Sequence, residues 1–368
     1  MNKLVNIFSN GDPNNPKTWS GTPFNLVKNF SKSKAIGLAL DWRDGINSII
    51  IFIVILLSYF YYFGSKDISR GKPLRQLYAN NISRIIKKYF IKNILYMGTL
   101  SLPYKTKNGA NHFLFCDSTW NLWSKYSTDM KGYSKLMLKH AETLEKESYH
   151  QMDHIFSIST YVRDNLISHY EVDPKKITVV GTGLGIIEPY FGPKNYNNGK
   201  IIFVAKGRFS DKGGPLVLEA FKLAQMVNPS LELCIVGQSE YEGIEDISNL
   251  KTYGFISIDA LQQLFNEASL FLMPATNEPW GLVYLEALAC KIPIVGLNMN
   301  GFPEISRNGE YGYILNDYSP SALSQVILDA FSSPKNLESM GLNGQNYCLK
   351  NFSWDHTASK IINVINSY

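Results

Sequence analysis

Short apolar segments alternate with helix-like segments along most of the 368-residue chain, and this alternation constrains the fold more than any other feature. Strands alternating with helices form a parallel sheet covered by helices on both faces. The pattern therefore predicts an α/β architecture. Hydrophobic residues make up 45% of the chain, which excludes a disordered protein. In the first half, the strand-like segments are 4–8, 35–40, 94–97, 113–116, 155–158 and 177–180.

The alternation restarts after a segment rich in glycine, proline and asparagine at 181–199, which is typical of a linker. The strand-like segments of the second half are 201–205, 231–236, 270–274 and 293–297. We therefore expect two Rossmann-like domains facing each other across a cleft, with ligands at the carboxyl ends of the strands. The predicted divisions are a first domain over 1–183, a second over 184–352, and a C-terminal helix over 353–368 that returns to the first domain.

A glycine-containing turn follows the first strand of the second half, in the sequence Lys206-Gly-Arg208-Phe-Ser-Asp-Lys212-Gly-Gly. Glycines at a strand-to-helix turn allow backbone N–H groups to approach a phosphate. The adjacent cations would offset the charge of a diphosphate. The alternative is a solvated basic turn, since no Walker A pattern is present.

Two carboxylates separated by seven residues follow the next motif-bearing strand, in the sequence Glu278-Pro-Trp-Gly281-Leu282-Val-Tyr-Leu-Glu286-Ala. We expect Glu278 in the strand-to-helix loop and Glu286 one turn inside the helix, with both facing one pocket. The alternatives are a loop acid for Glu278 and, for Glu286, an acid favoured by the helix dipole. A third glycine-containing helix start follows at 300–305, reading Asn-Gly-Phe-Pro-Glu-Ile.

Taken in order, these three loops resemble family 4 of the retaining glycosyltransferases, which have the GT-B fold. That family shows Gly-Arg…Lys-Gly, then Glu-Pro-(Phe)-Gly-Leu…Glu-Ala, then Gly-Gly-(Val)-Pro-Glu. The resemblance covers roughly residues 150–368. The chain departs from the pattern with Trp280 in place of Phe, Asn300 in place of Gly, and an Arg208–Lys212 spacing one residue shorter.

The resemblance implies a nucleoside-diphosphate sugar as co-substrate and assigns residues to it. Arg208 and Lys212 would hold the diphosphate, Glu278 would bind donor sugar hydroxyls near the reacting carbon, and Glu286 would bind the ribose. The backbone N–H groups of Gly281 and Leu282 would serve phosphate and sugar. The base would lie against the segment Tyr253-Gly254-Phe255, which precedes them in the chain.

No cofactor is expected, and metal independence is predicted because the chain contains no Asp-x-Asp sequence. Positive side chains and a helix N-terminus would stabilise the leaving group instead. Retention of the anomeric configuration is implied by the resemblance alone.

In the first half, Gly21 and Asp117 are the candidate site residues. Gly21 lies in a loop that resembles the glycine loop of many family members, and a glycine allows close backbone approach to a ligand. The alternative for this loop is a helix cap by Ser20 or Thr22. Asp117 follows a strand and would orient or deprotonate the acceptor hydroxyl. Its alternative is an Asx-type helix cap.

Residues 46–64 form an apolar stretch almost long enough to cross a membrane. A span would separate residues 1–45 from the rest of their sheet, so we expect a helix that is buried or dips into an interface. From Lys66 to Lys107 the chain has ten lysines and arginines and one acid, Asp67. Residues 74–92 read as an amphipathic basic helix. Residues 46–92 therefore predict peripheral contact with an anionic membrane, with a glycan or lipid-linked acceptor. The alternative is a buried helix with a solvated basic face.

Four widely spaced cysteines without a CxxC pair indicate reduced thiols in a cytoplasmic protein. Together with residues 46–92, this predicts a location on the inner face of a membrane. Nucleic-acid binding is not expected, since no reader motif accompanies the basic helix. Two alternative functions remain open: a nucleotide-sugar 2-epimerase of the same fold, and a catalytically inactive nucleotide-sugar-binding relative. The sugar, base, acceptor and oligomeric state are not determined by the sequence.

Overall fold

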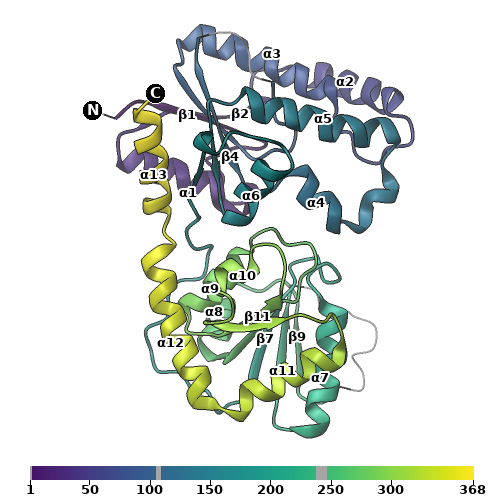
Figure 1. The fold of residues 1–368 in the computed structure, drawn as a ribbon, viewed down its shortest axis with the longest axis vertical. Helices are drawn as coiled ribbons and strands as arrows, with labels where there is room; N and C mark the ends of the chain where they lie inside the picture. Colours follow the sequence, from purple (N-terminus) through teal and green to yellow (C-terminus); the bar gives the residue numbers. More distant parts are fainter. Residues whose placement is uncertain (1, 105–108, 238–246) are drawn as a thin grey trace. The chain divides into compact units, whose positions relative to one another are not determined.

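The computed structural model describes residues 2–104, 109–237 and 247–368 and divides the chain into two compact units (Figure 1). Unit 1 contains Met1–Thr182 together with Trp354–Tyr368, and unit 2 contains Gly183–Ser353. The divisions written from the sequence differ from these by one residue at each boundary. The predicted α/β class is confirmed, because each unit is built on one parallel six-stranded sheet.

The sheet of unit 1 has the strand order β2-β1-β3-β4-β5-β6, with every pairing parallel. Its inner strands are buried apolar runs, which is typical of a sheet covered on both faces. The strands are β1 (Val5–Ser9), β2 (Ile36–Asp41), β3 (Asn93–Met97), β4 (Asn111–Cys116), β5 (His154–Ser157) and β6 (Ile177–Val179).

Helices cover both faces of this sheet (Figure 1). One face carries α1 (Thr22–Lys32) and α13 (Trp354–Asn366), which pack against each other. The predicted return of the C-terminal helix to the first domain is confirmed. The other face carries α3 (Lys72–Tyr89) and α5 (Lys135–Gln151). The remaining elements of unit 1 are α2 (Ser48–Tyr61), α4 (Trp120–Tyr126), α6 (Thr160–Ser168), η1 (Thr18–Gly21), η2 (Thr128–Gly132) and η3 (Pro174–Lys176).

The apolar stretch at 46–64 folds into α2, and its surroundings differ from one expectation. Among the 14 residues of α2 only Ser58 is buried, so the interpretation as a buried helix is wrong. None of the helices in the described residues has the length and apolar character needed to cross a bilayer. The adjacent basic segment forms α3, while its last two cations, Lys105 and Lys107, lie outside the described residues.

The sheet of unit 2 has the order β12-β11-β10-β7-β8-β9, again entirely parallel. Both edge strands were absent from the sequence interpretation. β9 has no buried residue, so it lacks the continuous apolar run by which a strand of a parallel sheet is recognised. The strands are β7 (Lys200–Val204), β8 (Glu232–Val236), β9 (Leu250–Tyr253), β10 (Leu270–Leu272), β11 (Ile294–Leu297) and β12 (Gly312–Leu315).

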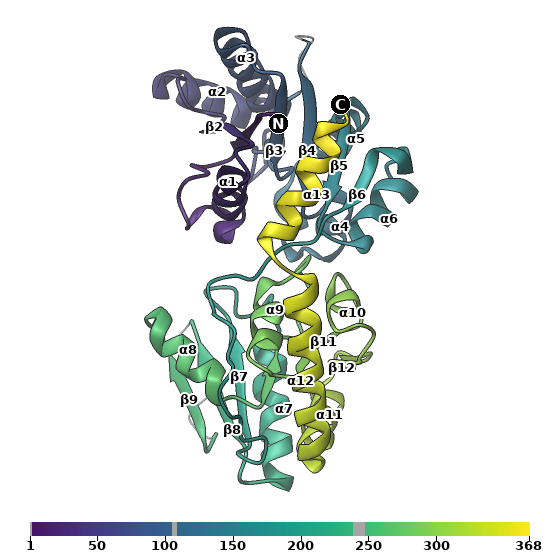
Figure 2. The ribbon, with the colours of Figure 1, turned by 90° about the vertical axis from the view of Figure 1, so that its left-hand side faces the viewer.

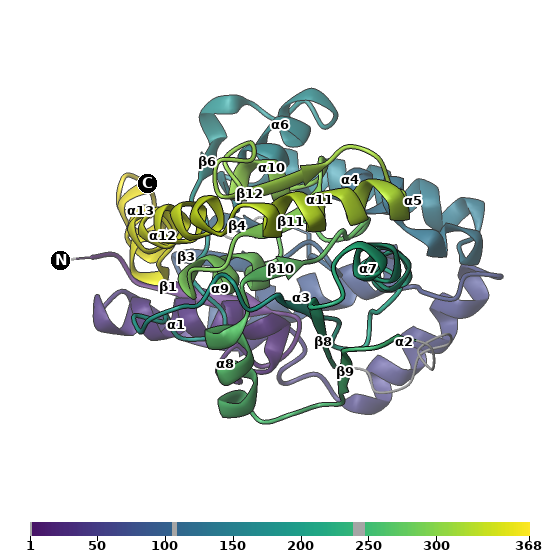
Figure 3. The same cartoon turned by 90° about the horizontal axis from the view of Figure 1, so that it is seen from below.

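In unit 2, α7 (Gly214–Val227) and α11 (Pro320–Ser332) pack together on one face of the sheet. α8 (Ile258–Glu267) and α9 (Leu282–Ala289) lie on the other face (Figure 3). α12 (Pro334–Asn351) packs against α9, as Figure 2 also shows, and α10 (Phe302–Ile305) is a single turn.

The segment predicted as a linker is part of unit 2 from Gly183 onward. Ile187 and Tyr196 are buried, and the Oη of Tyr196 donates a 2.8 Å hydrogen bond to the carbonyl of Lys291. The linker prediction is therefore wrong for 183–199. Glycine and proline in this segment reflect a packed irregular path rather than a free connection.

Candidate functional site

The three motif-bearing loops of unit 2 follow β7, β10 and β11, which are neighbours in the sheet. From β7 the chain continues to β8 and β9 in one direction, and from β10 it continues to β11 and β12 in the other. Ligands of open α/β sheets bind at such a reversal, outside the carboxyl ends of the strands. The loops after β7 and β10 flank the reversal, so their side chains form the candidate site.

The turn from β7 to α7 holds Arg208 beside the loop after β10. The Nη2 of Arg208 donates a 2.7 Å hydrogen bond to the carbonyl of Asn277 and lies 3.2 Å from the Oδ2 of Asp211. Gly213 caps α7 with a φ of 86°, and a Cβ at this position would lie 2.5 Å from the carbonyl oxygen of Pro274. Only glycine fits this turn without displacing the neighbouring loop.

Glu278 connects the two loops electrostatically. Its Oε2 lies 3.6 Å from the Nζ of Lys212 and 3.9 Å from the Nη1 of Arg208. The Lys212 ammonium is buried and also lies 3.5 Å from the Sδ of Met273. Burial lowers the pKa of Lys212, and the charge of Glu278 opposes this shift. Despite the shorter spacing in the sequence, the structure brings both cations to one carboxylate.

This cluster has the chemistry of an anion site. Lys206 adds a third positive charge near Lys212. The three cations thus face two carboxylates, Glu278 and Asp211, so an incoming diphosphate would find net positive charge. The roles assigned to Arg208, Lys212 and Glu278 stay predictions, and the structure supplies the geometry that they require.

Glu286 lies in the second turn of α9 and is buried. Its Oε1 accepts hydrogen bonds from the backbone N–H groups of Ile186 at 2.6 Å and Ile187 at 3.2 Å. Burial raises the pKa of Glu286, and these two N–H groups work against the rise. Its Oε2 makes no hydrogen bond within the described part of the chain. A Cβ on Gly185 would lie 2.1 Å from Oε1, so a larger residue at this position would displace the Glu286 carboxylate.

Gly281 and Leu282 form the start of α9. Gly281 is the N-cap with a φ of 85°, and a Cβ there would lie 2.8 Å from the ring of Tyr284. The first-turn N–H groups of a helix lack the usual partner four residues earlier. In α9 the N–H of Tyr284 donates a 3.0 Å hydrogen bond to the carbonyl of Gly281, while those of Leu282 and Val283 have no backbone partner among the described residues. In the third loop, Asn300 has a φ of 55°, a conformation that asparagine tolerates better than most residues. This property explains how Asn300 replaces a glycine.

Gly254 and Phe255 follow β9 at the edge of the sheet, two strands away from β7. The ring of Phe255 is 82% exposed. Within the described residues, no hydrogen bond or ion pair joins this pair to Arg208, Lys212 or Glu278. The structure therefore does not bring them into the cationic cluster, and their contact with a base stays a prediction.

In unit 1, Gly21 lies at the N-cap of α1 with a φ of 81°, directly after Trp19 and Ser20, which also have positive φ values of 43° and 53°. No side chain caps α1, so the alternative of a cap by Ser20 or Thr22 is wrong. Three consecutive residues in the left-handed region make this an unusual backbone segment. Its contact with a donor stays a prediction.

Asp117 follows β4 and is half-buried. Burial raises the pKa of its carboxyl to about 6, and the N–H groups of Asp117 and Ser118 and the charge of Arg70 limit the rise. The cap of α4 is Thr119, whose Oγ1 accepts from the N–H of Leu122 at 3.2 Å. The helix-cap alternative for Asp117 is therefore wrong, and its role as acceptor residue stays a prediction.

Three contacts of the site were missing from the sequence interpretation: Asp211 on Arg208, the carbonyl of Asn277 on the same guanidinium, and the Ile186–Ile187 amides on Glu286. The contact between Arg208 and Asp211 could have been predicted, because an acid three residues after an arginine favours an ion pair. The other two join segments 69 and about 100 residues apart, which no local pattern reveals.

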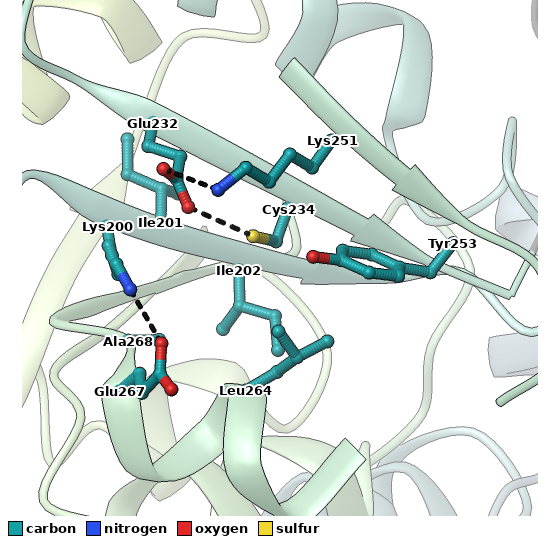
Figure 4. Close-up of a pocket in the computed structure, with 10 residues that line it drawn as sticks. All are labelled: Lys200, Ile201, Ile202, Glu232, Cys234, Lys251, Tyr253, Leu264, Glu267 and Ala268. Carbon is teal, nitrogen blue, oxygen red and sulfur yellow. Dashed lines mark hydrogen bonds and ion pairs between the residues drawn. The ribbon is translucent and has the colours of Figure 1, made fainter. Parts of the chain in front are cut away.

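A separate hollow of about 60 Å³ lies between α8 and strands β7 to β9 (Figure 4). Its charged side chains are paired with each other, Lys200 with Glu267 at 2.6 Å and Lys251 with Glu232 at 2.9 Å. Tyr253 is the one lining residue from the segment expected near the base. Since the pairs satisfy each other, this hollow offers no free charge to a ligand.

Comparison with known proteins identifies similarity in the second half of the chain. Residues 187–347 match the family described as "Glycosyl transferases group 1". The D-inositol 3-phosphate glycosyltransferase of Rhodococcus jostii is 25% identical over 241 residues, which cover 59% of this chain and 53% of that protein. The similarity thus spans about half the length of this curated relative.

Two solved structures share the architecture over nearly the whole chain. Sucrose-phosphate synthase from Thermosynechococcus elongatus has a TM-score of 0.71 at 15% identity, covering 99% of this chain and 98% of that one. HepE from Anabaena, solved in complex with UDP, has a TM-score of 0.65 at 14% identity, covering 99% of this chain and 100% of that one. Together with the two parallel sheets, these likenesses show that the chain has the GT-B fold.

Proposed function

We propose that this protein is a glycosyltransferase that uses a nucleoside-diphosphate sugar. The observation that carries the proposal is the placement of Glu278 between Lys212 and Arg208, on the two loops that flank the strand-order reversal of unit 2. The group 1 glycosyltransferase match over 187–347 includes all three of these residues. The UDP bound to Anabaena HepE is consistent with a nucleotide ligand for this fold.

In this proposal, Arg208 and Lys212 bind the diphosphate. Glu278 then gives up its ion pairs with them and hydrogen-bonds the donor sugar. Glu286 offers Oε2, which has no hydrogen bond to any described residue, to a ribose hydroxyl, and its Oε1 stays bonded to the backbone of 186–187. The first-turn N–H groups at Gly281 and Leu282 serve phosphate and sugar, and Phe255 with Gly254 contacts the base.

We further propose retention of configuration, as in family 4. The bond from the anomeric carbon to the diphosphate breaks and the diphosphate departs with the electron pair. The acceptor oxygen then bonds to the same face, and its hydroxyl proton passes to a base. The positive charges of Arg208 and Lys212 stabilise the leaving diphosphate without a metal ion. NMR of the product distinguishes the stereochemical outcomes: an α-linked donor gives an α-linked product if configuration is retained.

For the acceptor, we propose a glycan or a lipid-linked sugar on the cytoplasmic face of a membrane, with unit 1 contacting anionic lipid through residues 46–92. Asp117 is the candidate residue for the acceptor hydroxyl. Gly21 is the candidate position in unit 1 for close backbone approach to the donor. The position of each residue in the fold supports its role, and the raised pKa of Asp117 supports proton transfer at this carboxyl.

A thermal-shift screen with UDP, GDP, ADP, TDP and CMP in EDTA tests the donor site. A ligand at 100 times its Kd stabilises the folded protein by about 2.7 kcal/mol. We expect one nucleotide to raise the melting temperature of the wild type and not that of Arg208→Ala. Lys222→Ala is the matched control, because Lys222 pairs with Glu219 on α7 outside the site. If all five nucleotides leave the wild type unchanged, the proposed donor site is wrong.

A further inference from the structure

The surface of α2 is apolar and uncovered. No charged residue occurs between Asp44 and Lys66. Phe52 is 65% exposed and Phe60 is 71% exposed, and Phe63 just beyond the helix is 87% exposed. Exposed apolar patches of this kind mark contact surfaces on folded proteins. No residue of the described part of the chain buries these side chains.

The helix is nevertheless held firmly in the fold. Tyr62, directly after α2, is fully buried; its Oη accepts a 2.8 Å hydrogen bond from the N–H of Lys72 and lies 2.7 Å from Nδ1 of His140. At the other end, the side chain of Asn47 accepts from the N–H of Ile49 at 2.8 Å. The exposure of α2 is therefore a fixed feature of unit 1 rather than fraying of a loose segment.

The length of α2 excludes a crossing and favours an interfacial position. At 1.5 Å per residue, its 14 residues extend about 21 Å, while the hydrocarbon core of a bilayer is about 30 Å thick. A helix that is apolar all round is normally buried in protein or lipid. Lying in the plane of one leaflet would bury its exposed side without a crossing.

The neighbouring surface carries positive charge and aromatic rings. α3 lies beside α2 (Figures 1 and 2) and exposes Arg84, Lys87 and Lys88. Tyr89 is 51% exposed and Phe90 is 85% exposed at its C-terminal end. Cations of this kind complement anionic headgroups, and aromatic rings favour the membrane–water interface. A symmetric second copy would instead place the same cations opposite one another.

We propose that α2 is an interfacial helix that inserts its exposed apolar side chains into one leaflet of an anionic bilayer, while the cations of α3 contact the headgroups. This inference rests on the proposed membrane-bound acceptor and deepens it by assigning insertion to α2. It also separates two contributions, burial of apolar surface by α2 and salt-sensitive attraction by α3.

Vesicle sedimentation tests the assignment. Wild type is expected to bind vesicles of phosphatidylcholine and phosphatidylglycerol, and Phe52→Ser/Leu56→Ser/Phe60→Ser is expected to bind at least about tenfold more weakly. The matched control is Met226→Ser/Val227→Ser, which removes exposed apolar side chains from α7 in unit 2. Lys87→Gln/Lys88→Gln should weaken binding mainly at low salt. The proposal is overturned if the triple variant binds the vesicles as tightly as the wild type does, or if the wild type does not bind them at all.

A labelling experiment remains informative if the triple variant fails to fold. The four native cysteines are buried, so Phe60→Cys provides a single accessible thiol for an environment-sensitive dye. We expect a blue shift on adding vesicles, and none for Met226→Cys. A blue shift that depends on protein concentration and not on lipid would identify a second copy as the occupant. The nucleotide thermal shift is measured on the same variants, so loss of membrane binding and failure of the donor site remain distinguishable.

Discussion

Glu278 and Glu286 occupy different environments although both were expected to face one pocket. Glu278 lies among cations, and its ion pairs with Lys212 and Arg208 must open before a diphosphate binds there. Glu286 is buried and holds the backbone of Ile186 and Ile187 through one oxygen. The ion pairs of Glu278 can therefore be exchanged for a ligand. Glu286 instead has one oxygen bonded to the backbone and one oxygen that makes no hydrogen bond within the described ranges.

This difference predicts a division of labour between two size-matched changes. Glu278→Gln should leave the donor Kd within about threefold, because the cations remain, and lower kcat by about 100-fold, because charge near the reacting carbon is lost. Glu286→Gln should raise the donor Kd about tenfold, equivalent to about 1.4 kcal/mol. Calorimetric titration and initial rates measure the two effects. Equal losses of donor affinity in both variants would contradict the division.

Asp117 predicts the pH dependence of transfer. Burial raises its pKa to about 6, so the ionised form needed to accept a proton is lost as the pH falls through about 6. The value of kcat/KM should decline about tenfold per pH unit below this point. Asp117→Asn should have a low kcat/KM that does not decline further as the pH falls below about 6. A variant profile that keeps the wild-type decline would assign the titration to another group.

At the scale of elements, α13 completes unit 1 from the far end of the chain. Ile361, Ile362 and Ile365 are buried where α13 packs against α1. The last residue, Tyr368, donates a 2.8 Å hydrogen bond from its Oη to the carbonyl of Asp153. Unit 1 is therefore a discontinuous domain whose core requires residues more than 300 positions apart.

Shortening one core side chain of α13 tests this dependence. Ile361→Ala should lower the free energy of unfolding of unit 1 by about 2–5 kcal/mol, since it leaves a cavity in a packed core. Asn363→Ala on the exposed side of the same helix is the control and should change stability by less than about 0.5 kcal/mol. Urea denaturation followed by circular dichroism measures both. Equal, small effects would show that α13 contributes little to the core.

On the scale of the whole molecule, each unit has its own sheet and core, while the proposed donor residues with ion-pair contacts all belong to unit 2. A ligand stabilises only what it binds. Calorimetry of the wild type should therefore resolve two components, and a bound nucleoside diphosphate should raise the melting temperature of the unit 2 component by several degrees. Arg208→Ala should abolish that shift. A single transition whose melting temperature rises with the nucleotide would show that the two units unfold together.

The sequence by itself determined the α/β class, the order of the motifs and the three loops of unit 2 that carry them. Apolar runs such as 201–205 and glycines such as Gly213 and Gly281 express local requirements, namely burial in a parallel sheet and a positive φ, which a local pattern reveals.

Only the tertiary structure decided what depends on distant partners. It brought Glu278 into an ion pair with Lys212 and bonded Glu286 to the backbone N–H groups of 186–187. It left α2 exposed rather than buried. It also formed the edge strand β9 from a segment without a continuous apolar run. Whether a side chain is buried or paired depends on which distant segment packs against it. The tertiary fold determines that contact, and the neighbouring residues in the chain do not.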